Sequence, residues 1–296
     1  MTGDRVLVTG ASGFIGRHVV ASLAAEPDVD VVPVEHRWSD IRHVAASVGA
    51  RGVDRCLHLG WYASPDDYLT NVQGNVGSLG QSMELIEWLA SVGCRHVTVA
   101  GSCAEYAEAD HLLDEDDTIA PWSVYGASKA ALHLLLSSSY LPVGMSVAWA
   151  RLFNLTGPGE HRDRLLPMAT RALLEGRTVS LSPGEQRRDF LDVVDAARAL
   201  TELSLVEVVG SFNVCSSEPV QLRELITQIG TAIGRPELLR FGERAYGEHD
   251  PMLVAGVNHR LRAATGWEPA FDREQMIQRM IEYWRSRRMH QDVTTR

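Results

Sequence analysis

Lysine is almost absent from this sequence. The chain of 296 residues holds 28 basic residues, and every one of them except Lys129 is an arginine. The planar guanidinium of arginine does not replace a compact ammonium group, so a site that needs an ammonium has to use Lys129. The alternative is an ordinary surface lysine on an ordinary helix.

An excess of positive charge, a long apolar run and paired cysteines are also absent. The formal net charge of -10 and the pI of about 5.6 argue against a nucleic-acid partner. No apolar stretch approaches the ~18 residues of a membrane span, so we expect no membrane partner and a cytoplasmic location. The four cysteines are scattered and no His-Glu-x-x-His pattern occurs, so we expect reduced thiols and no metal site.

Apolar strands alternate with helical patterns through the first half of the chain. We predict strands at residues 6–9, 29–34, 56–59, 96–100 and 145–150. We predict helices after the turn at 10–16, at 79–91, and from the tyrosine-lysine stretch at 123–129 to about 138. This alternation predicts an α/β fold with a doubly wound parallel sheet, the Rossmann arrangement.

The pattern becomes less regular beyond residue 153. A strand at 212–215 and helices at 166–174, 222–233 and 274–285 predict a smaller α/β substrate-binding region on the C-terminal side. We assign residues 154–177 and 213–296 to that region. Residues 1–153, joined by about 178–212, form the predicted dinucleotide-binding domain.

A glycine-rich turn follows the first predicted strand and opens a helix. Glycines let the backbone approach a pyrophosphate, and the helix N-terminus favours its negative charge. The spacing is G-x-x-G-x-x-G, which differs from the G-x-G-x-x-G fingerprint, and a plain strand-turn-helix is the alternative. We predict that a dinucleotide contacts the turn and the end of the third strand, at Gly10, Ser12, Gly13, Phe14, Ile15, Gly16 and Leu59.

The end of the second predicted strand carries opposing signals about the cofactor. Glu35 is placed to accept hydrogen bonds from an adenosine ribose, which favours NAD. His36 and Arg37 could instead hold a 2'-phosphate, which favours NADP, and Asp40 and Ile41 would lie near the adenine. A solvated strand end remains the alternative. We slightly favour NADP(H) over NAD(H).

Tyr125 and Lys129 are four residues apart, so on a helix their side chains share one face. A phenol has a pKa of about 10 and exchanges protons poorly at neutral pH. A nearby ammonium stabilises the phenolate and makes that exchange easier. The pair is therefore a candidate acid-base site.

With the glycine-rich turn, this pair and a serine after the fourth strand, the chain resembles the extended short-chain dehydrogenase/reductase family, of the NAD-dependent epimerase/dehydratase type, over nearly its whole length. The family's catalytic Ser or Thr, Tyr and Lys match Ser102, Tyr125 and Lys129. The resemblance implies that Tyr125 and Lys129 also contact the cofactor and that Ser102 contacts the substrate. Asn154 and Arg188 match residues that hold a nucleotide-sugar diphosphate, although a structural turn and a surface charge pair are the alternatives.

Departures from the family pattern narrow the implied chemistry. Dehydratases of the family carry an Asp-Glu pair directly after the catalytic Thr, whereas Ser102 is followed by Cys103 and Ala104. Enzymes of the family that both epimerise and reduce carry a cysteine two places after the serine, which is Ala104 here. We therefore read Cys103 as a packing thiol. The segments around Ser102 and Asn154 look closest to reductases of nucleotide-linked 4-keto-6-deoxy sugars.

The resemblance implies an NAD(P)-dependent oxidoreductase whose partner is a nucleotide sugar. We expect hydride transfer to C4 of an NDP-4-keto-6-deoxyhexose, with Tyr125 as general acid. A nucleotide-sugar 4-epimerase is the first alternative, and a non-catalytic cofactor-sensing binding protein is the second. The resemblance also implies a homodimer formed through the helices at 79–91 and 130–138.

Overall fold

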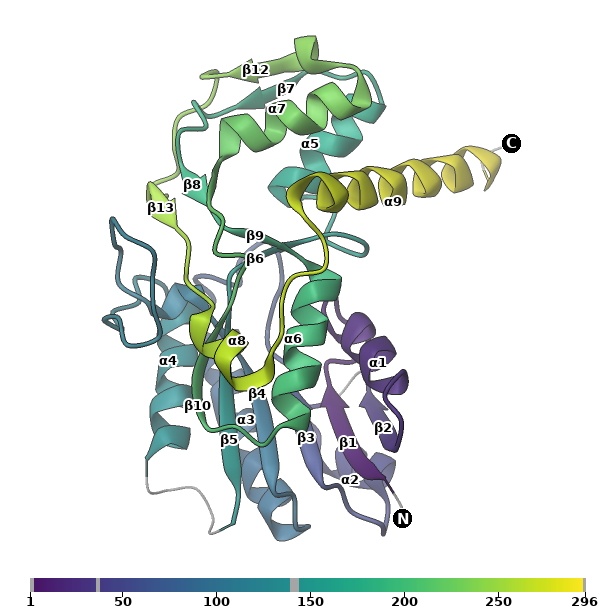
Figure 1. Ribbon diagram of the computed structural model, residues 1–296, viewed down its shortest axis with the longest axis vertical. Coiled ribbons are helices and arrows are strands. Elements are labelled where there is room, and N and C mark those ends of the chain that lie inside the picture. The colour runs from purple at the N-terminus through teal and green to yellow at the C-terminus, as the bar shows by residue number, and fades with distance from the viewer. Residues whose placement is uncertain (1–2, 36–37, 139–143, 295–296) are drawn as a thin grey trace.

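Six parallel strands form the large sheet of the computed structural model, which describes residues 3–35, 38–138 and 144–294. The strands are β1 (Asp4–Thr9), β2 (Val29–Val34), β3 (Arg55–His58), β4 (His96–Ser102), β5 (Ser146–Leu152) and β10 (Gly210–Val214). Their order is β10-β5-β4-β3-β1-β2 (Figure 1). The chain passes to opposite sides of β1, and ligands of such sheets bind at this switch point, outside the carboxyl ends of the strands. The predicted α/β Rossmann class is confirmed.

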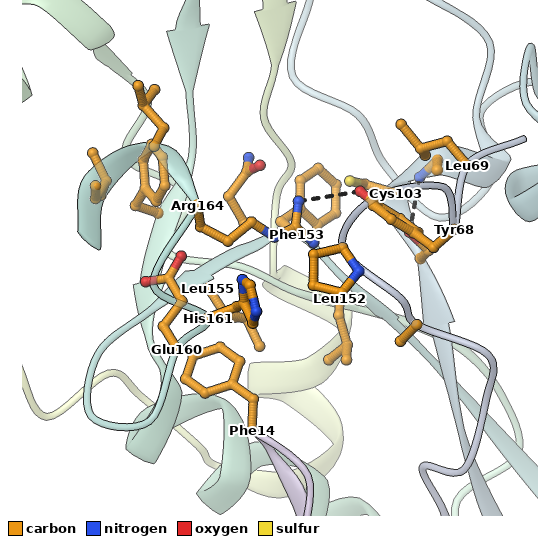
Figure 2. Close-up of a pocket in the computed structure, with 18 of the residues that line it drawn as sticks. Phe14, Tyr68, Leu69, Cys103, Leu152, Phe153, Leu155, Glu160, His161 and Arg164 are labelled. Carbon is orange, nitrogen blue, oxygen red and sulfur yellow. Dashed lines mark hydrogen bonds between the residues drawn. The ribbon is translucent and has the colours of Figure 1, made fainter. Parts of the chain in front are cut away.

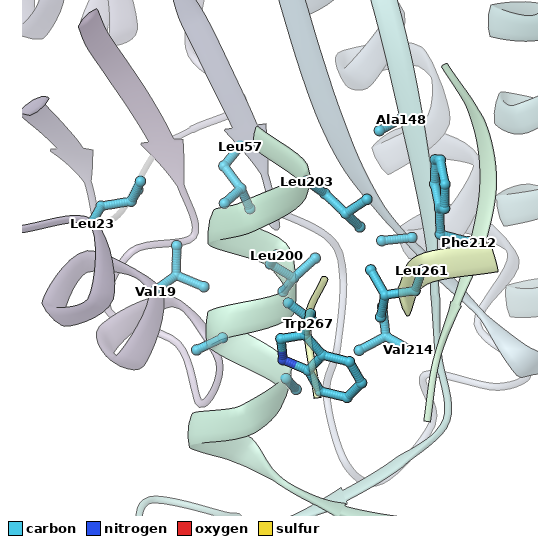
Figure 3. Packing of buried hydrophobic residues seen from close by; sticks show 14 of the residues in the cluster. Val19, Leu23, Leu57, Ala148, Leu200, Leu203, Phe212, Val214, Leu261 and Trp267 are labelled. Carbon is cyan, nitrogen blue, oxygen red and sulfur yellow. The ribbon is translucent and has the colours of Figure 1, made fainter. Parts of the chain in front are cut away.

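Helices cover both faces of this sheet. One face packs against α1 (Gly16–Ala24), α6 (Val193–Leu205) and α8 (His259–Thr265), and the other against α2 (Ile41–Val48), α3 (Val72–Ser91) and α4 (Val124–Ser137). Side chains of successive strand residues alternate between the two cores, with Val6 and Val8 in one and Leu7 in the other. Figure 3 shows the first core, in which Leu200 and Trp267 meet the strands. The sheet is thus buried on both faces.

A second group of elements lies beyond the carboxyl ends of the large sheet (Figure 1). It comprises α5 (Leu165–Leu174), α7 (Leu222–Ile233), α9 (Arg273–Thr294), β7 (Val179–Leu181), η2 (Pro236–Leu238) and β12 (Leu239–Phe241) around a hydrophobic cluster of their own. Between the two groups run the short strands β6 (Asn154–Thr156), β8 (Arg187–Arg188), β9 (Phe190–Asp192), β11 (Val220–Gln221) and β13 (Leu253–Val254). Our residue boundaries for two domains stay a prediction.

Five helices differ from the sequence-based expectation. The helix predicted at 79–91 begins at Val72, because Asn71 caps it by accepting from the Gly74 amide while glycines dilute the apolar pattern. The helix predicted at 274–285 continues to Thr294. The short α2, capped by Asp40, was not predicted, and neither were α6 and α8. None of the helices in the described ranges is long and apolar enough to cross a membrane.

Candidate active site

A cleft of about 1010 Å³ opens between the carboxyl ends of the large sheet and the second group of elements (Figure 2). Most of the predicted site residues line it, namely Gly10, Ser12, Gly13, Phe14, Ile15, Gly16, Glu35, Leu59, Ser102, Tyr125, Lys129, Asn154 and Arg188. Asp40 and Ile41 are not among its lining residues. His36 and Arg37 lie outside the described residues. The cleft therefore joins the predicted cofactor and substrate residues in one space.

The glycine-rich turn is held in a shape that side chains would prevent. Gly10 has φ +68° and packs against the backbone of the segment after β3. A Cβ on Gly16 would lie 2.1 Å from the Gly10 carbonyl oxygen, so only glycine allows this close approach. Within the described chain, the backbone N–H groups of Phe14 and Ile15 make no hydrogen bond. Free N–H groups before a helix fit the pyrophosphate of a dinucleotide.

The residues expected to select the cofactor are only partly brought together. Glu35 lines the cleft, and its carbonyl oxygen accepts a hydrogen bond from the Ser12 hydroxyl at 3.1 Å. The Asp40 carboxylate accepts from two amides of α2, and Ile41 packs against the core. Of the described residues that we expected near the adenosine, only Glu35 thus lines the cleft.

Lys129 is buried at 3% exposure in α4. Its ammonium donates to the Ala100 carbonyl at 2.7 Å and lies 3.8 Å from the centre of the Trp61 ring. Burial lowers the pKa of Lys129 to about 7, and the Glu105 carboxylate opposes that shift. The amine can therefore lose its proton near neutral pH, which an exposed lysine cannot do.

Tyr125 comes close to Ser102 because α4 approaches the end of β4 at a glycine. A Cβ on Gly126 would lie 2.1 Å from the Ala104 carbonyl oxygen. The Lys129 ammonium lies 6.0 Å from the Tyr125 ring centre. Burial raises the pKa of Tyr125 above its usual value, and a hydrogen bond with Ser102 opposes the rise. The lowering that we expected from Lys129 is not among the influences on this pKa, and the phenol stays protonated at neutral pH.

Ser102 begins the short helix η1 (Cys103–Glu105) through a capping box with Glu105. The Glu105 carboxylate is fully buried and accepts from the Ser102 amide at 2.7 Å and from Arg151 Nε at 3.0 Å. Burial raises the pKa of Glu105, and Arg151 opposes the rise. This ion pair below the cleft fixes the backbone that carries Ser102.

Asn154 and Arg188 face the cleft from short strands on its far side. The Asn154 amide donates to the Asp189 carbonyl oxygen at 3.1 Å. Arg188 donates to the Asp250 carboxylate and to the Arg187 carbonyl oxygen, and Asp250 also accepts from Gln186. These bonds use only part of the five N–H donors of Arg188, so others can meet an anion.

Several lining residues were missed by the sequence analysis. Tyr68 packs edge to face against Tyr125 at 5.2 Å, and its hydroxyl accepts from Arg164 at 3.2 Å across the cleft (Figure 2). Trp61 follows β3, where residues at the carboxyl end of a strand usually meet ligand, and that position was the available signal. Tyr68 and Glu160 lie in loops, and no pattern in the sequence indicated that they would line the cleft.

Cys103 lines the cleft next to Ser102, and burial raises its pKa to about 12. Such a thiol is not a nucleophile at neutral pH, in keeping with the predicted packing role. No group of three or more potential ligands among the described residues could hold a metal ion.

The sequence profile of the NAD dependent epimerase/dehydratase family matches residues 6–215. The chain belongs to this family. It is an NAD(P)-dependent enzyme of the extended short-chain dehydrogenase/reductase type, as predicted. The GDP-6-deoxy-D-mannose reductase of Pseudomonas aeruginosa is 28% identical and aligns with 96% of this chain and 98% of its own length. A UDP-glucose 4-epimerase of Azospirillum brasilense is 26% identical, over 98% and 94%.

Solved structures with a similar fold cover nearly the whole of this chain. RMD from Pseudomonas aeruginosa, complexed with NADPH, superimposes with a TM-score of 0.84 at 26% identity, covering 96% of this chain and 99% of that one. MoeE5, in complex with UDP-glucuronic acid and NAD, superimposes with a TM-score of 0.82 at 26% identity, covering 97% and 100%. Both neighbours hold a nicotinamide dinucleotide, which is NADPH in the first and NAD in the second.

Proposed function

We propose that this enzyme is a nucleotide-sugar 4-ketoreductase that acts on an NDP-4-keto-6-deoxyhexose. The observation that carries the proposal is the meeting of Ser102, Tyr125 and Lys129 in the cleft that also holds the glycine-rich turn. The likeness to a GDP-6-deoxy-D-mannose reductase, over nearly the full length of both chains, supports a deoxysugar substrate.

In this mechanism the protein supplies the proton and the electrostatic support. When bound, a reduced nicotinamide supplies the hydride. Tyr125, whose pKa burial keeps high, gives its proton to the oxygen that becomes the C4 hydroxyl. Ser102 donates a hydrogen bond to that oxygen, and Lys129 stabilises the phenolate that Tyr125 becomes. General acid catalysis of this kind contributes about 10²- to 10⁴-fold.

Dehydration is disfavoured because Glu105, the acidic residue that follows Ser102 most closely in the sequence, is buried. Removal of water needs an acid and a base that can reach the sugar. Glu105 is buried, and its oxygens accept from Ser102, Trp149 and Arg151. It therefore supports the backbone and has no access to a substrate.

We propose NADP(H) as the slightly preferred cofactor and a homodimer as the assembly. The NADPH complex of a neighbour supports the first choice, whereas Glu35 and the NAD complex of another favour NAD(H). For the dimer, α3 and α4 carry exposed apolar side chains, namely Val72, Val76, Leu134 and Leu135. Light scattering gives the mass of the assembly directly.

The test follows nicotinamide absorbance with a panel of nucleotide-linked 4-keto sugars, using NADH and NADPH separately. We expect consumption with at least one sugar, and a loss of about 10²- to 10⁴-fold in turnover for Tyr125→Phe with cofactor binding retained. Tyr246→Phe, which removes a phenol that bonds Glu185 outside the cleft lining, is the matched control. Near-normal turnover of Tyr125→Phe would contradict the role of Tyr125 as general acid.

The main rival is a nucleotide-sugar 4-epimerase, which the likeness to UDP-glucose 4-epimerase favours. It uses the same three side chains but regenerates NAD in each cycle. A tightly held cofactor and sugar interconversion without net NAD(P)H consumption would identify it. A cofactor-sensing binding protein has no need of all three groups, and NADPH binding without turnover on any 4-keto sugar nucleotide would revive that reading.

A further inference from the structure

A second, smaller pocket of about 310 Å³ lies beside the cleft. Its walls come from α1, from the segment after β6, from α5 and from α9. Figure 1 shows that α9, which supplies one of these walls, extends away from the body of the molecule. Five arginines line it, namely Arg17, Arg162, Arg171, Arg287 and Arg288.

This concentration of positive charge is unusual for a chain with a net charge of -10. The pocket has two carboxylates in its lining, Glu160 and Glu175, and Glu175 is already paired with Arg177. Arg162 lies 3.9 Å from the Asp163 carboxylate. Within the described chain, Arg17, Arg171 and Arg287 form no ion pair within 4.0 Å, and burial together with the Arg162 charge lowers the pKa of Arg171, against the opposing carboxylates of Glu175 and Asp163. Like charges gathered in this way destabilise the empty pocket, and an anion relieves their repulsion.

Each of these three arginines is held in place by contacts that leave donors free. Arg17 donates to the carbonyl oxygens of Ser12 and Gly13. Arg171 donates to the Arg162 carbonyl oxygen at 3.4 Å and lies over the Trp284 ring. A guanidinium has five donors, so each keeps several for a ligand.

Arg287 completes the set from the last helix, over the Tyr283 ring at 5.0 Å. Trp284 also lines the pocket, and its buried indole N–H has no partner among the described atoms. The pocket thus offers guanidinium forks beside aromatic rings. Such forks match the oxygen pairs of phosphate groups.

We propose that this pocket is a second ligand site, which binds a small phosphate-bearing anion of about the size of pyrophosphate. The five arginines of the lining favour a multiply charged anion, and the volume is at the lower end of small-molecule pockets. Glu160 and His161 line both this pocket and the cleft. The site is therefore a neighbour of the cofactor turn, but its arginines lie outside the catalytic set.

The test is calorimetric titration of sodium pyrophosphate into protein saturated with the nicotinamide dinucleotide that it binds, at about 0.1 M salt. We expect one site in the wild-type protein, weakened at least about 10-fold by Arg171→Gln with Arg287→Gln, since each removes a charged donor. Arg285→Gln, on the same helix outside the pocket, is the matched control. Arg287→Gln alone serves if the double variant melts earlier than wild type.

Arg188→Gln separates this site from the diphosphate position in the cleft. Retained pyrophosphate binding in Arg188→Gln, together with the loss in the pocket variants, supports the proposal. Unchanged binding in the pocket variants, loss in Arg188→Gln instead, or no binding in the wild-type protein overturns it. None of these results depends on which sugar the enzyme reduces.

Discussion

Two buried arginines, Arg151 and Arg188, have different surroundings in the structure. Arg151 lies below the cleft and donates to Glu105, Tyr106, the Glu115 carbonyl oxygen and His133. Arg188 lines the cleft and has two protein partners. Arg151 therefore donates its hydrogen bonds within the protein, whereas Arg188 keeps N–H donors for a ligand.

The largest effect is expected below the cleft. Arg151→Met leaves Glu105 buried without its cation, which costs about 3–5 kcal/mol in the free energy of unfolding. Urea denaturation followed by circular dichroism measures the loss. Arg188→Met is the matched control, because the carboxylate of its partner, Asp250, is 28% exposed. Equal stability of the two variants would contradict the claim that Arg151 supports the fold more than Arg188 does.

Lys129 is a third buried cation, to which the proposed mechanism gives a part in catalysis. In Lys129→Arg a larger, planar group replaces an ammonium that fits between Ala100 and Trp61. We expect turnover to fall by about 10²-fold or more, with the protein still folded. Steady-state kinetics and a thermal melt are the measurements. If the variant turns over normally, the solitary lysine has no part in catalysis.

Arg188→Gln tests whether Arg188, unlike Arg151, uses its N–H donors to bind the substrate. The loss of one charged donor toward a diphosphate costs about 1.5–3 kcal/mol of binding, or roughly 10- to 100-fold in KM. We expect kcat to change little, because the contact is the same in ground and transition states. Substrate titrations at fixed cofactor give both constants. A fall in kcat with an unchanged KM contradicts a binding role.

The smallest effect concerns Glu160, which lies between the cleft and the basic pocket. Burial raises the pKa of Glu160 to about 7, while Thr156 and Arg164 oppose the rise. Because the folded-state pKa exceeds the unfolded value, the wild-type protein loses stability as the pH rises from about 4.5 to 7. The other charged or titratable groups that line the basic pocket are Arg17, His161, Arg162, Arg171, Glu175, Tyr283, Arg287 and Arg288.

Glu160→Gln removes that titration and keeps an acceptor for Thr156. We expect the variant to be more stable than wild type above pH 7, by an amount on the order of 1 kcal/mol, with the difference vanishing near pH 4.5. Unfolding free energies across this pH range test the expectation. A difference that is constant with pH shows that Glu160 titrates normally.

The parts of the site that follow from the sequence are those fixed by local geometry. The turn from Gly10 to Gly16 depends on glycines that allow close backbone contacts, and the Tyr125 to Lys129 spacing depends on one helix. Such short-range relations are visible in a string of residues. The same reasoning gave α7 with its bounds, because the apolar pattern of that helix is strong.

What the sequence did not predict depends on segments that meet from far apart. Asp250 reaches Arg188 from 62 residues away, and Tyr68 reaches Arg164 across 96 residues. Neither pair has a periodic or motif signal, because loop paths decide which side chains face each other. The basic pocket was missed for the same reason, since its arginines lie on separate elements.

The solitary lysine also makes the protein easy to label. An amine-directed reagent has one side-chain target in this sequence, and that target lines the cleft at 3% exposure. Because burial lowers its pKa to about 7, much of the amine is neutral and nucleophilic at neutral pH, unlike ordinary lysines. The extent of modification of Lys129, measured on the peptide that carries it so that the α-amino group is not counted, can therefore report how fully the cleft is occupied.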